Sequence, residues 1–223
     1  MTGLKPFDFI TFDCYGTLID WRSGIVASFS RMARAAAVVV DGERILREYA
    51  RFERQIERQS YRPYRDVLRQ ASALVAASLV LPIPPVESGF LADSLPDWLP
   101  FDDTNAALER LRAAGIGLGI LSNVDDDLLV ETRKHFTVDF DLIITAQQVR
   151  SYKPGEAHFL AARERIGPAR WLHAGQSYFH DIVPTRAHGI PNAWINRHHE
   201  PAGAERAADR EFADMKSFAA AMA

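Results

Sequence analysis

The chain has 223 residues, of which 48% are hydrophobic and 25% are charged, and these proportions are ordinary for a globular protein. The formal net charge of −3 gives no reason to expect nucleic acid as a partner. The single cysteine excludes an internal disulfide, and the most apolar stretch, residues 71–85, is too short to cross a bilayer. Because the N-terminus lacks the pattern of a signal peptide, the sequence predicts a cytoplasmic protein without a membrane partner.

Short apolar segments, each followed by polar or turn residues, predict β-strands along most of the chain. They span residues 7–13, 116–123, 140–146, 171–175 and 190–196. Helical patterns separate these strands, at residues 103–115, 156–167 and 181–189. Because strands alternate with helices, the sequence predicts an α/β fold with a doubly wound parallel sheet.

The segment between the first two predicted strands breaks this alternation, because it has little strand pattern from about Ser23 to Leu95. Its helical patterns span residues 24–38, 41–59 and 64–80. We therefore predict an inserted helical cap subdomain at residues 21–96. The Rossmann-like core domain is then expected to consist of residues 1–20 and 97–223.

Polar side chains gather just after the predicted strands. In an open parallel sheet, ligands bind at the carboxyl ends of the strands. The polar residues at these ends are Asp13, Thr17, Ser122, Asn123, Lys153, Gln176, Ser177 and Asp181. A carboxylate at the end of a rigid strand can attack an electrophile and form an ester or acyl phosphate. A neighbouring lysine would keep that carboxylate ionised, and hydroxyl and turn N–H groups would bind an anionic substrate group.

The motifs that carry these residues resemble those of the haloacid dehalogenase (HAD) superfamily in order and spacing. They are DCYGTLID at 13–20, ILSN at 120–123, SYKP at 151–154 and GQSYFHDI at 175–182. The resemblance covers nearly the whole chain and implies a hydrolase of small-molecule substrates with a HAD-like Rossmannoid core. It also implies that Asp13 is the nucleophile, that Lys153 stabilises Asp13, and that Asp181 orients Lys153.

Two departures from the most common HAD pattern bear on the chemistry. Most members of the superfamily are Mg²⁺-dependent phosphatases with motifs that resemble D-x-D-G-T and G-D-S-x-x-x-D. Here Tyr15 stands at the second Asp of the first motif, and Gln176 stands at the first Asp of the last. Mg²⁺ prefers anionic oxygen ligands, so both the metal site and the acid for the leaving group are weakened. We expect no cofactor; Mg²⁺ belongs to the phosphatase alternative.

The pattern D-x-Y-G-T-L at 13–18 is similar to that of L-2-haloacid dehalogenases, whose halide leaves without a proton. The chain also resembles a related hydrolase that opens the ring of azetidine-2-carboxylate, and WINR at 194–197 extends the likeness to the dehalogenases. The resemblance implies hydrolysis of a small 2-substituted carboxylic acid through an aspartyl ester. A homodimer would match the dehalogenase branch.

Residues that contact the substrate are implied in both parts of the chain. In the core domain they are Tyr15, Thr17, Ser122, Asn123, Ser177 and Tyr178. Dehalogenases have an Asn at the position of Tyr178, and a phenol cannot reproduce the geometry of an amide, so the substrate is left open. The family also uses a cap arginine, for which Arg51 is preferred by rough alignment over its neighbours. These neighbours are Arg44, Arg47 and Arg54.

Several patterns have other interpretations. The acidic run at 125–127 resembles a metal cluster, but acids are favoured in the first turn of a helix, so we expect no metal ligand there. Cys14 should point away from the face of Asp13 and be buried. Ser177 and Asp181 could form a Ser-His-Asp set, but no nucleophile-elbow pattern supports it. Its candidate histidines are His173, His180 and His188. A Mg²⁺-dependent phosphatase and a member used for binding or regulation remain as alternative functions.

Overall fold

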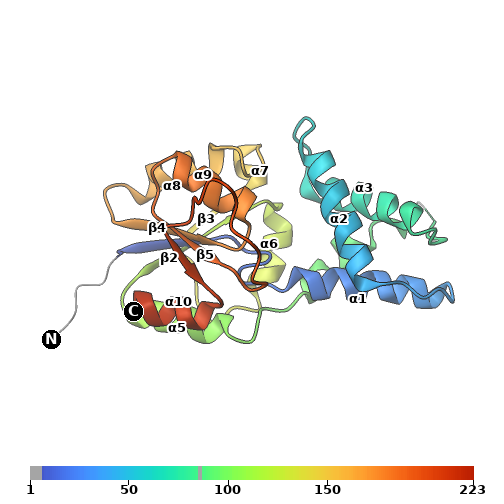
Figure 1. The fold of residues 1–223 in the computed structure, drawn as a ribbon, viewed down its shortest axis with the longest axis horizontal. Helices are drawn as coiled ribbons and strands as arrows, with labels where there is room; N and C mark the ends of the chain where they lie inside the picture. The colour runs from blue at the N-terminus through green and yellow to red at the C-terminus, as the bar shows by residue number, and fades with distance from the viewer. Residues whose placement is uncertain (1–6, 85–86) are drawn as a thin grey trace. The chain divides into compact units, whose positions relative to one another are not determined.

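The computed structural model describes residues 7–84 and 87–223, and the chain forms two compact units (Figure 1). The first unit comprises the chain as far as Ile19, together with Pro100–Asn123 and Lys134–Ala223. The second unit comprises Asp20–Leu99 and Val124–Arg133. The predicted insertion, 21–96, therefore lacks residues 124–133 of this second unit. That the units act as core and cap domains stays a prediction.

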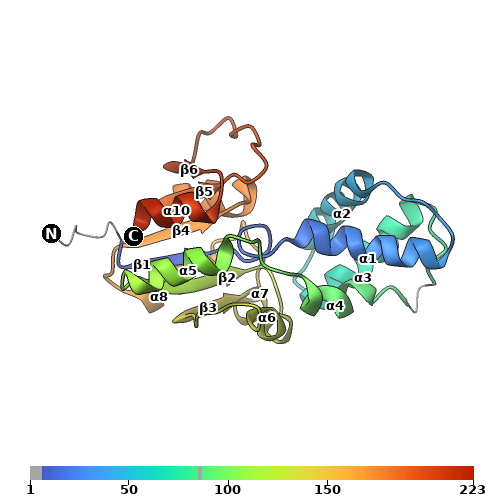
Figure 2. The same ribbon diagram turned by 90° about the horizontal axis from the view of Figure 1, so that it is seen from below.

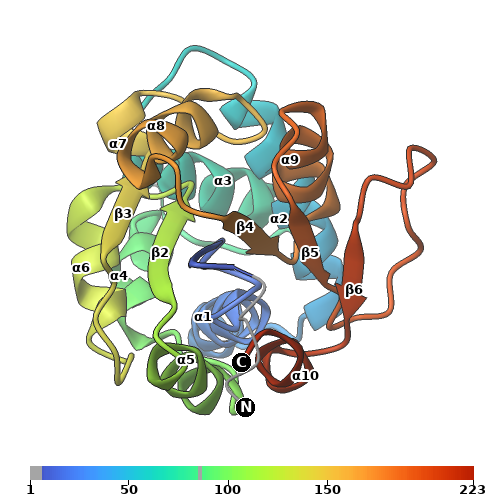
Figure 3. The same cartoon turned by 90° about the vertical axis from the view of Figure 1, so that its left-hand side faces the viewer.

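The first unit is built on a parallel sheet of six strands. Strands β1 to β6 span Phe9–Phe12, Gly117–Ser122, Leu142–Thr145, Trp171–Gly175, Asn192–Ile195 and Arg210–Phe212. Their order is β3-β2-β1-β4-β5-β6, and each neighbouring pair is parallel (Figure 3). The predicted α/β fold with a parallel sheet is confirmed.

Helices cover both faces of this sheet, and the alternation of side chains along the strands explains why. On one face α5 (Thr104–Ala113) and α10 (Met215–Met222) lie side by side (Figure 2). On the other face lie α8 (Ala157–Ile166) and α9 (Val183–Ala187) (Figure 1). Ile10 of β1 packs in the α5–α10 cluster, whereas its neighbour Phe9 packs in the cluster that contains Phe159 of α8.

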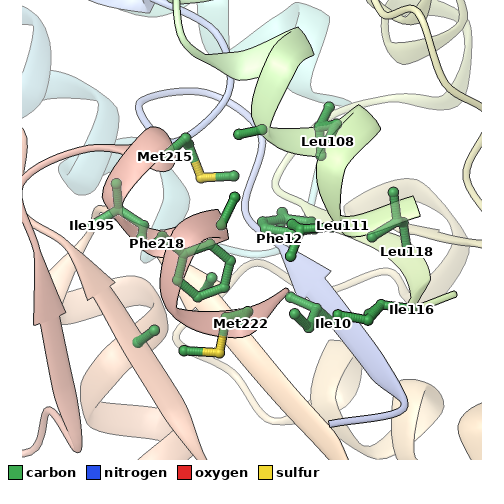
Figure 4. Packing of buried hydrophobic residues seen from close by; sticks show 14 of the residues in the cluster. Ile10, Phe12, Leu108, Leu111, Ile116, Leu118, Ile195, Met215, Phe218 and Met222 are labelled. Carbon is green, nitrogen blue, oxygen red and sulfur yellow. The ribbon is translucent and has the colours of Figure 1, made fainter. Parts of the chain in front are cut away.

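The core under α5 and α10 is closely packed (Figure 4). The rings of Phe12 and Phe218 meet edge to face, with their centroids 6.0 Å apart. Leu108 from α5 and Met215 from α10 fill the space beside them, and both are fully buried. Each buried side chain of this size contributes about 1.5–3 kcal/mol through the removal of apolar surface from water. This packing fixes β1, the strand that precedes Asp13.

The second unit is helical. Its helices α1, α2, α3, α4 and α6 span Trp21–Ala35, Gly42–Glu57, Tyr64–Ser78, Phe90–Ser94 and Asp126–Arg133. Asp125 caps α3, because its carboxylate accepts hydrogen bonds from the backbone N–H groups of Tyr64 at 2.8 Å and Arg65 at 2.9 Å. Asp127 pairs with the Arg65 guanidinium at 2.7 Å. These bonds connect the beginning of 124–133 to α3 of the same unit.

Two elements differ from the sequence prediction. Strand β6 was not predicted, because its three residues, Arg210–Phe212, are largely exposed at the edge of the sheet and form no apolar run. The helix predicted at 181–189 begins earlier, with a π-helical turn at Tyr178–Ile182 that leads into α9. Among the residues that the structure describes, no helix is long and apolar enough to span a membrane.

The core assignment predicts unequal costs for two leucine substitutions. Leu108→Ala should lower the free energy of unfolding by about 2–5 kcal/mol, because it leaves a cavity in packed surroundings. Leu160→Ala on α8, where the leucine is 45% exposed, is the matched control and should cost less than about 1 kcal/mol. Urea unfolding followed by circular dichroism measures both values. Equal costs would contradict the assignment.

Candidate active site

Asp13 lies directly after the last residue of β1. Its backbone N–H donates to the carbonyl oxygen of Ala174 on β4 at 3.0 Å, which extends the ladder by one bond. The chain then turns at Gly16, whose φ of +106° favours glycine. This turn brings back Thr17, whose hydroxyl donates to Asp13 Oδ2 at 3.0 Å. The turn thus gives the carboxylate, which is 8% exposed, a fixed hydrogen-bond donor.

The ammonium group of Lys153 lies between two carboxylates. Its Nζ atom donates to Asp13 Oδ1 at 3.0 Å and to Asp181 Oδ1 at 2.6 Å. A third bond runs to the carbonyl oxygen of Leu121 at 2.8 Å. The lysine is 1% exposed, and three acceptors match the three protons of an ammonium group. The structure therefore brings Asp13, Lys153 and Asp181 together, as the sequence predicted.

The backbone of Lys153 is held by Asn123. The Asn123 Nδ2 atom donates to the Lys153 carbonyl oxygen at 3.0 Å, and the Lys153 N–H donates to Asn123 Oδ1 at 2.7 Å. The sequence had assigned Asn123 to the substrate. Both polar groups of its side chain contact the Lys153 backbone, so Asn123 orients the lysine. The substrate contact implied for Asn123 stays a prediction.

Burial and charge set the protonation states of this cluster. Burial raises the pKa of Asp13 to about 6, although the Lys153 ammonium partly opposes the rise. Burial would also raise the pKa of Asp181, but Lys153 and His173 outweigh it and hold that pKa well below its usual range. For Lys153, burial is outweighed by the two carboxylates, and its pKa is raised. At neutral pH an ammonium ion thus sits between two carboxylates.

The turn that carries Thr17 is held by two further groups. The Thr17 Oγ1 atom accepts from the backbone N–H of Gln176 at 2.8 Å, which connects the first and fourth motifs. The Arg197 guanidinium donates to the Thr17 carbonyl oxygen at 2.9 Å and to Asp103 Oδ1 at 3.0 Å, and it stacks over Phe101. Arg197 was absent from the predicted site. Its place just after β5 was the signal that could have identified it.

The predicted substrate-binding side chains differ in what they contact. Within the described ranges, the Ser122 hydroxyl is buried and has no hydrogen-bond partner. Ser177 caps the π-helical turn and accepts from the His180 N–H at 3.1 Å. The Tyr178 hydroxyl accepts from the Ala207 N–H at 2.6 Å. Tyr15 is partly buried in the turn after β1.

Tyr178 therefore anchors the segment that follows β5. Its ring meets Trp194 edge to face at 4.8 Å, and a side chain at position 203 would collide with that ring. Both contacts, like the bond to Ala207, are internal to the first unit. The substrate role implied for Tyr178 stays a prediction.

Arg51 lies in the second unit, on α2. There it pairs with Glu48 and stacks over the ring of Phe52, with 57% of its side chain exposed. Its implied contact with substrate stays a prediction.

The structure also shows the surroundings of the cysteine, of the histidines and of the acidic residues that the sequence offered for other chemistry. Cys14 is fully buried, and burial raises the pKa of its thiol, so the group stays protonated. Ser177 contacts His180 at 3.0 Å, whereas Asp181 contacts His173 at 3.1 Å, so the hydroxyl and the carboxylate bond to different histidines. In the described part of the chain, no three side chains of His, Cys, Asp or Glu are grouped to hold a metal ion.

Comparisons with known proteins place this chain in a family. A family model described as haloacid dehalogenase-like hydrolase matches residues 7–189. The (S)-2-haloacid dehalogenase of Pseudomonas putida is 29% identical over 208 residues, which cover 87% of this chain and 86% of that protein. The chain belongs to the haloacid dehalogenase-like hydrolases.

Solved structures agree with this placement. An L-2-haloacid dehalogenase matches with a TM-score of 0.86 and 25% identity, over 96% of this chain and 97% of that one. The L-2-haloacid dehalogenase of Xanthobacter autotrophicus with chloropropionic acid covalently bound has a TM-score of 0.82. It is 21% identical, the match covers 96% of this chain and 97% of that one, and at this identity it shows the fold alone.

The geometry predicts an elevated titration of Asp13. Its carboxyl ¹³C resonance, identified by its loss in Asp13→Asn, should titrate with a midpoint near pH 6, against an ordinary value of 3.8. Since the Lys153 ammonium lowers this pKa, Lys153→Met should move the midpoint further up. NMR of aspartate-labelled protein measures both. A midpoint near 4, or a fall in Lys153→Met, would contradict the described charge arrangement.

Proposed function

We propose that this protein hydrolyses a small carboxylic acid with a leaving group at carbon 2, and that a 2-haloacid is the substrate class. The observation that carries the proposal is the buried Asp13 carboxylate, which has one donor on each oxygen, Lys153 and Thr17. The 2-haloacid dehalogenases among the relatives support the same substrate class.

The donor set around Asp13 favours displacement at carbon over metal-assisted phosphoryl transfer. The Lys153 ammonium bridges Asp13 and Asp181, the two carboxylates that a cation would otherwise share. Gln176 supplies an amide where phosphatases have a third acid, and its backbone N–H is bonded to Thr17. Mg²⁺ favours anionic oxygens, so this set fits it poorly. Accordingly, we propose a reaction without a metal cofactor.

The proposed reaction has two steps. In the first, an oxygen of Asp13 attacks carbon 2 and forms an ester, the carbon–halogen bond breaks, and the halide leaves with the bonding electrons and without a proton. Tyr15, at the position of the acid in phosphatases, then has no leaving group to protonate. In the second step, water attacks the ester carbonyl, and the bond between the acyl carbon and the ester oxygen breaks. One proton of the water goes to the 2-hydroxyacid and the other to solvent, and the Asp13 carboxylate is regenerated.

The surrounding groups have complementary roles in this proposal. Lys153 keeps Asp13 ionised before attack, and Asp181 orients Lys153. The hydroxyl of Ser122 and the N–H groups of the turns bind the substrate carboxylate. The substrate is a small molecule, and the proposed assembly is a homodimer like that of the dehalogenase branch.

Halide release tests the substrate class. Wild-type protein with (S)-2-chloropropionate should release chloride equally with and without EDTA, and Asp13→Asn should lower the rate by at least about 1,000-fold. Asp139→Asn, an exposed aspartate outside the site, is the matched control and should retain the rate. Phosphate release from a phosphate monoester, with and without EDTA, is measured in parallel. Phosphate release that EDTA abolishes, with no chloride release, would contradict the proposal.

A heavy-oxygen experiment tests the ester. With enzyme in excess over substrate in H₂¹⁸O, the first turnover should place ¹⁸O in the carboxyl group of Asp13, because water attacks the ester carbonyl. The product of that turnover should contain oxygen from the protein. Mass spectrometry of the peptide with Asp13 measures the label. Label in the product but not in the peptide would show that Asp13 acts as a base for water instead.

A further inference from the structure

A buried histidine outside the proposed mechanism lies behind Asp181. His173 is on β4, is fully buried, and contacts Asp181 Oδ1 through Nε2 at 3.1 Å. On the other side of the ring, Nδ1 is 2.8 Å from the hydroxyl of Thr11 on β1. The indole N–H of Trp171 donates to that same hydroxyl oxygen at 2.8 Å. These contacts form one chain from Trp171 to Asp181.

The donors and acceptors in this chain have a single consistent direction. An indole N–H can only donate, so the oxygen of Thr11 is the acceptor at that end. A carboxylate can only accept, so His173 Nε2 must carry the proton that points at Asp181. The neutral ring then presents a bare Nδ1, to which the Thr11 hydroxyl donates. The opposite tautomer would place a nitrogen lone pair against the Asp181 carboxylate.

The surroundings of His173 favour this neutral, oriented ring. Burial lowers its pKa, against the opposing effect of Asp181. The charged groups that act on it are Asp181 and Lys153, and the neighbouring helix α8 contributes the ring of Phe159, edge to face at 5.5 Å. The neutral His158 of α8 is also close enough to interact. The imidazole is therefore held by contacts from α8, from β1 and from the π-helical turn.

Asp181 depends on His173 because few other groups donate hydrogen bonds to its carboxylate. Its Oδ1 atom accepts from Lys153 and His173, while within the described residues Oδ2 has no hydrogen-bond partner. The carboxyl group packs against the backbone of Gly175, where an added Cβ would lie 2.6 Å from the Asp181 Cβ. Gly175 provides room for Asp181, but among the described residues only the side chains of His173 and Lys153 donate to its carboxylate. Without His173, Lys153 is the one side chain among the described residues that donates a hydrogen bond to the Asp181 carboxylate.

We propose that His173 is a positioning residue for the hydrolysis, which holds Asp181 so that Lys153 is shared between Asp181 and Asp13. Without the imidazole donor, the Asp181 carboxylate attracts the ammonium more strongly. The ammonium then stabilises Asp13 less, although His173 touches neither Asp13 nor the reacting atoms. This inference rests on the proposed function of Asp13 as the nucleophile.

The tautomer is measured first, on the wild-type protein without substrate. In ¹⁵N-histidine-labelled protein at pH 7, His173 should show a protonated Nε2 and an unprotonated Nδ1, with its signals assigned by their loss in His173→Gln. A ring protonated at Nδ1 alone would overturn the proposal. This measurement requires no activity, so its outcome is separate from that of halide release.

Variants then test the connection to Asp13. His173→Phe should raise the midpoint of the Asp13 titration by about half a unit or more and lower kcat by about 10–100-fold, with KM changed by less than about threefold. His173→Gln retains a donor and an acceptor, so its Asp13 midpoint and its kcat should both lie between those of the wild type and His173→Phe. His158→Phe, the matched buried histidine, should leave the Asp13 midpoint in place. An unchanged midpoint in His173→Phe, or an equal shift in His158→Phe, would overturn the proposal.

Discussion

The site depends on one interaction, the burial of the Lys153 ammonium between Asp13 and Asp181. Removing one member of a buried ionic group typically costs about 3–5 kcal/mol, because the remaining charge is left without compensation. The surrounding structure secures this arrangement from several directions. Asn123 fixes the lysine backbone, the Leu121 carbonyl accepts the third hydrogen bond of the ammonium, and the core beneath β1 fixes the strand that precedes Asp13. The geometry of this site and the stability of the fold thus depend on the same contacts.

The strands and most helices could be predicted from the sequence, because buried parallel strands are apolar runs that end in turn residues. Asp13, Lys153 and Asp181 were identified for the same reason, since each follows a predicted strand or a recognisable motif. Strand β6 could not be predicted, because an exposed edge strand needs no apolar pattern. The place of 124–133 in the helical unit was not predicted either, because the Asp125 carboxylate accepts hydrogen bonds from residues about sixty positions away.

Side-chain roles were harder to predict than positions. Asn123 and Tyr178 lie in the predicted motifs, and their polar groups bond to the backbone of Lys153 and Ala207, contacts that residue type alone does not reveal. His173 and Arg197 reach the site through their contacts with Asp181 and Thr17. Such indirect roles follow from hydrogen-bond direction and burial, which a motif does not encode. The likeness to dehalogenases therefore locates the motif residues better than it gives the contacts that their side chains make.

The cap that Asp125 provides to α3 has a consequence for the order in which the chain can fold. Helix α3 begins at Tyr64, but the carboxylate that completes its N-terminus follows β2 in the chain. During synthesis the helical unit therefore remains incomplete until β2 and the next residues have left the ribosome. An N-terminal fragment that stops at Leu99 would lack this cap, even though it contains α1 to α4. The helical unit can therefore be completed only after β2 of the first unit has been synthesised.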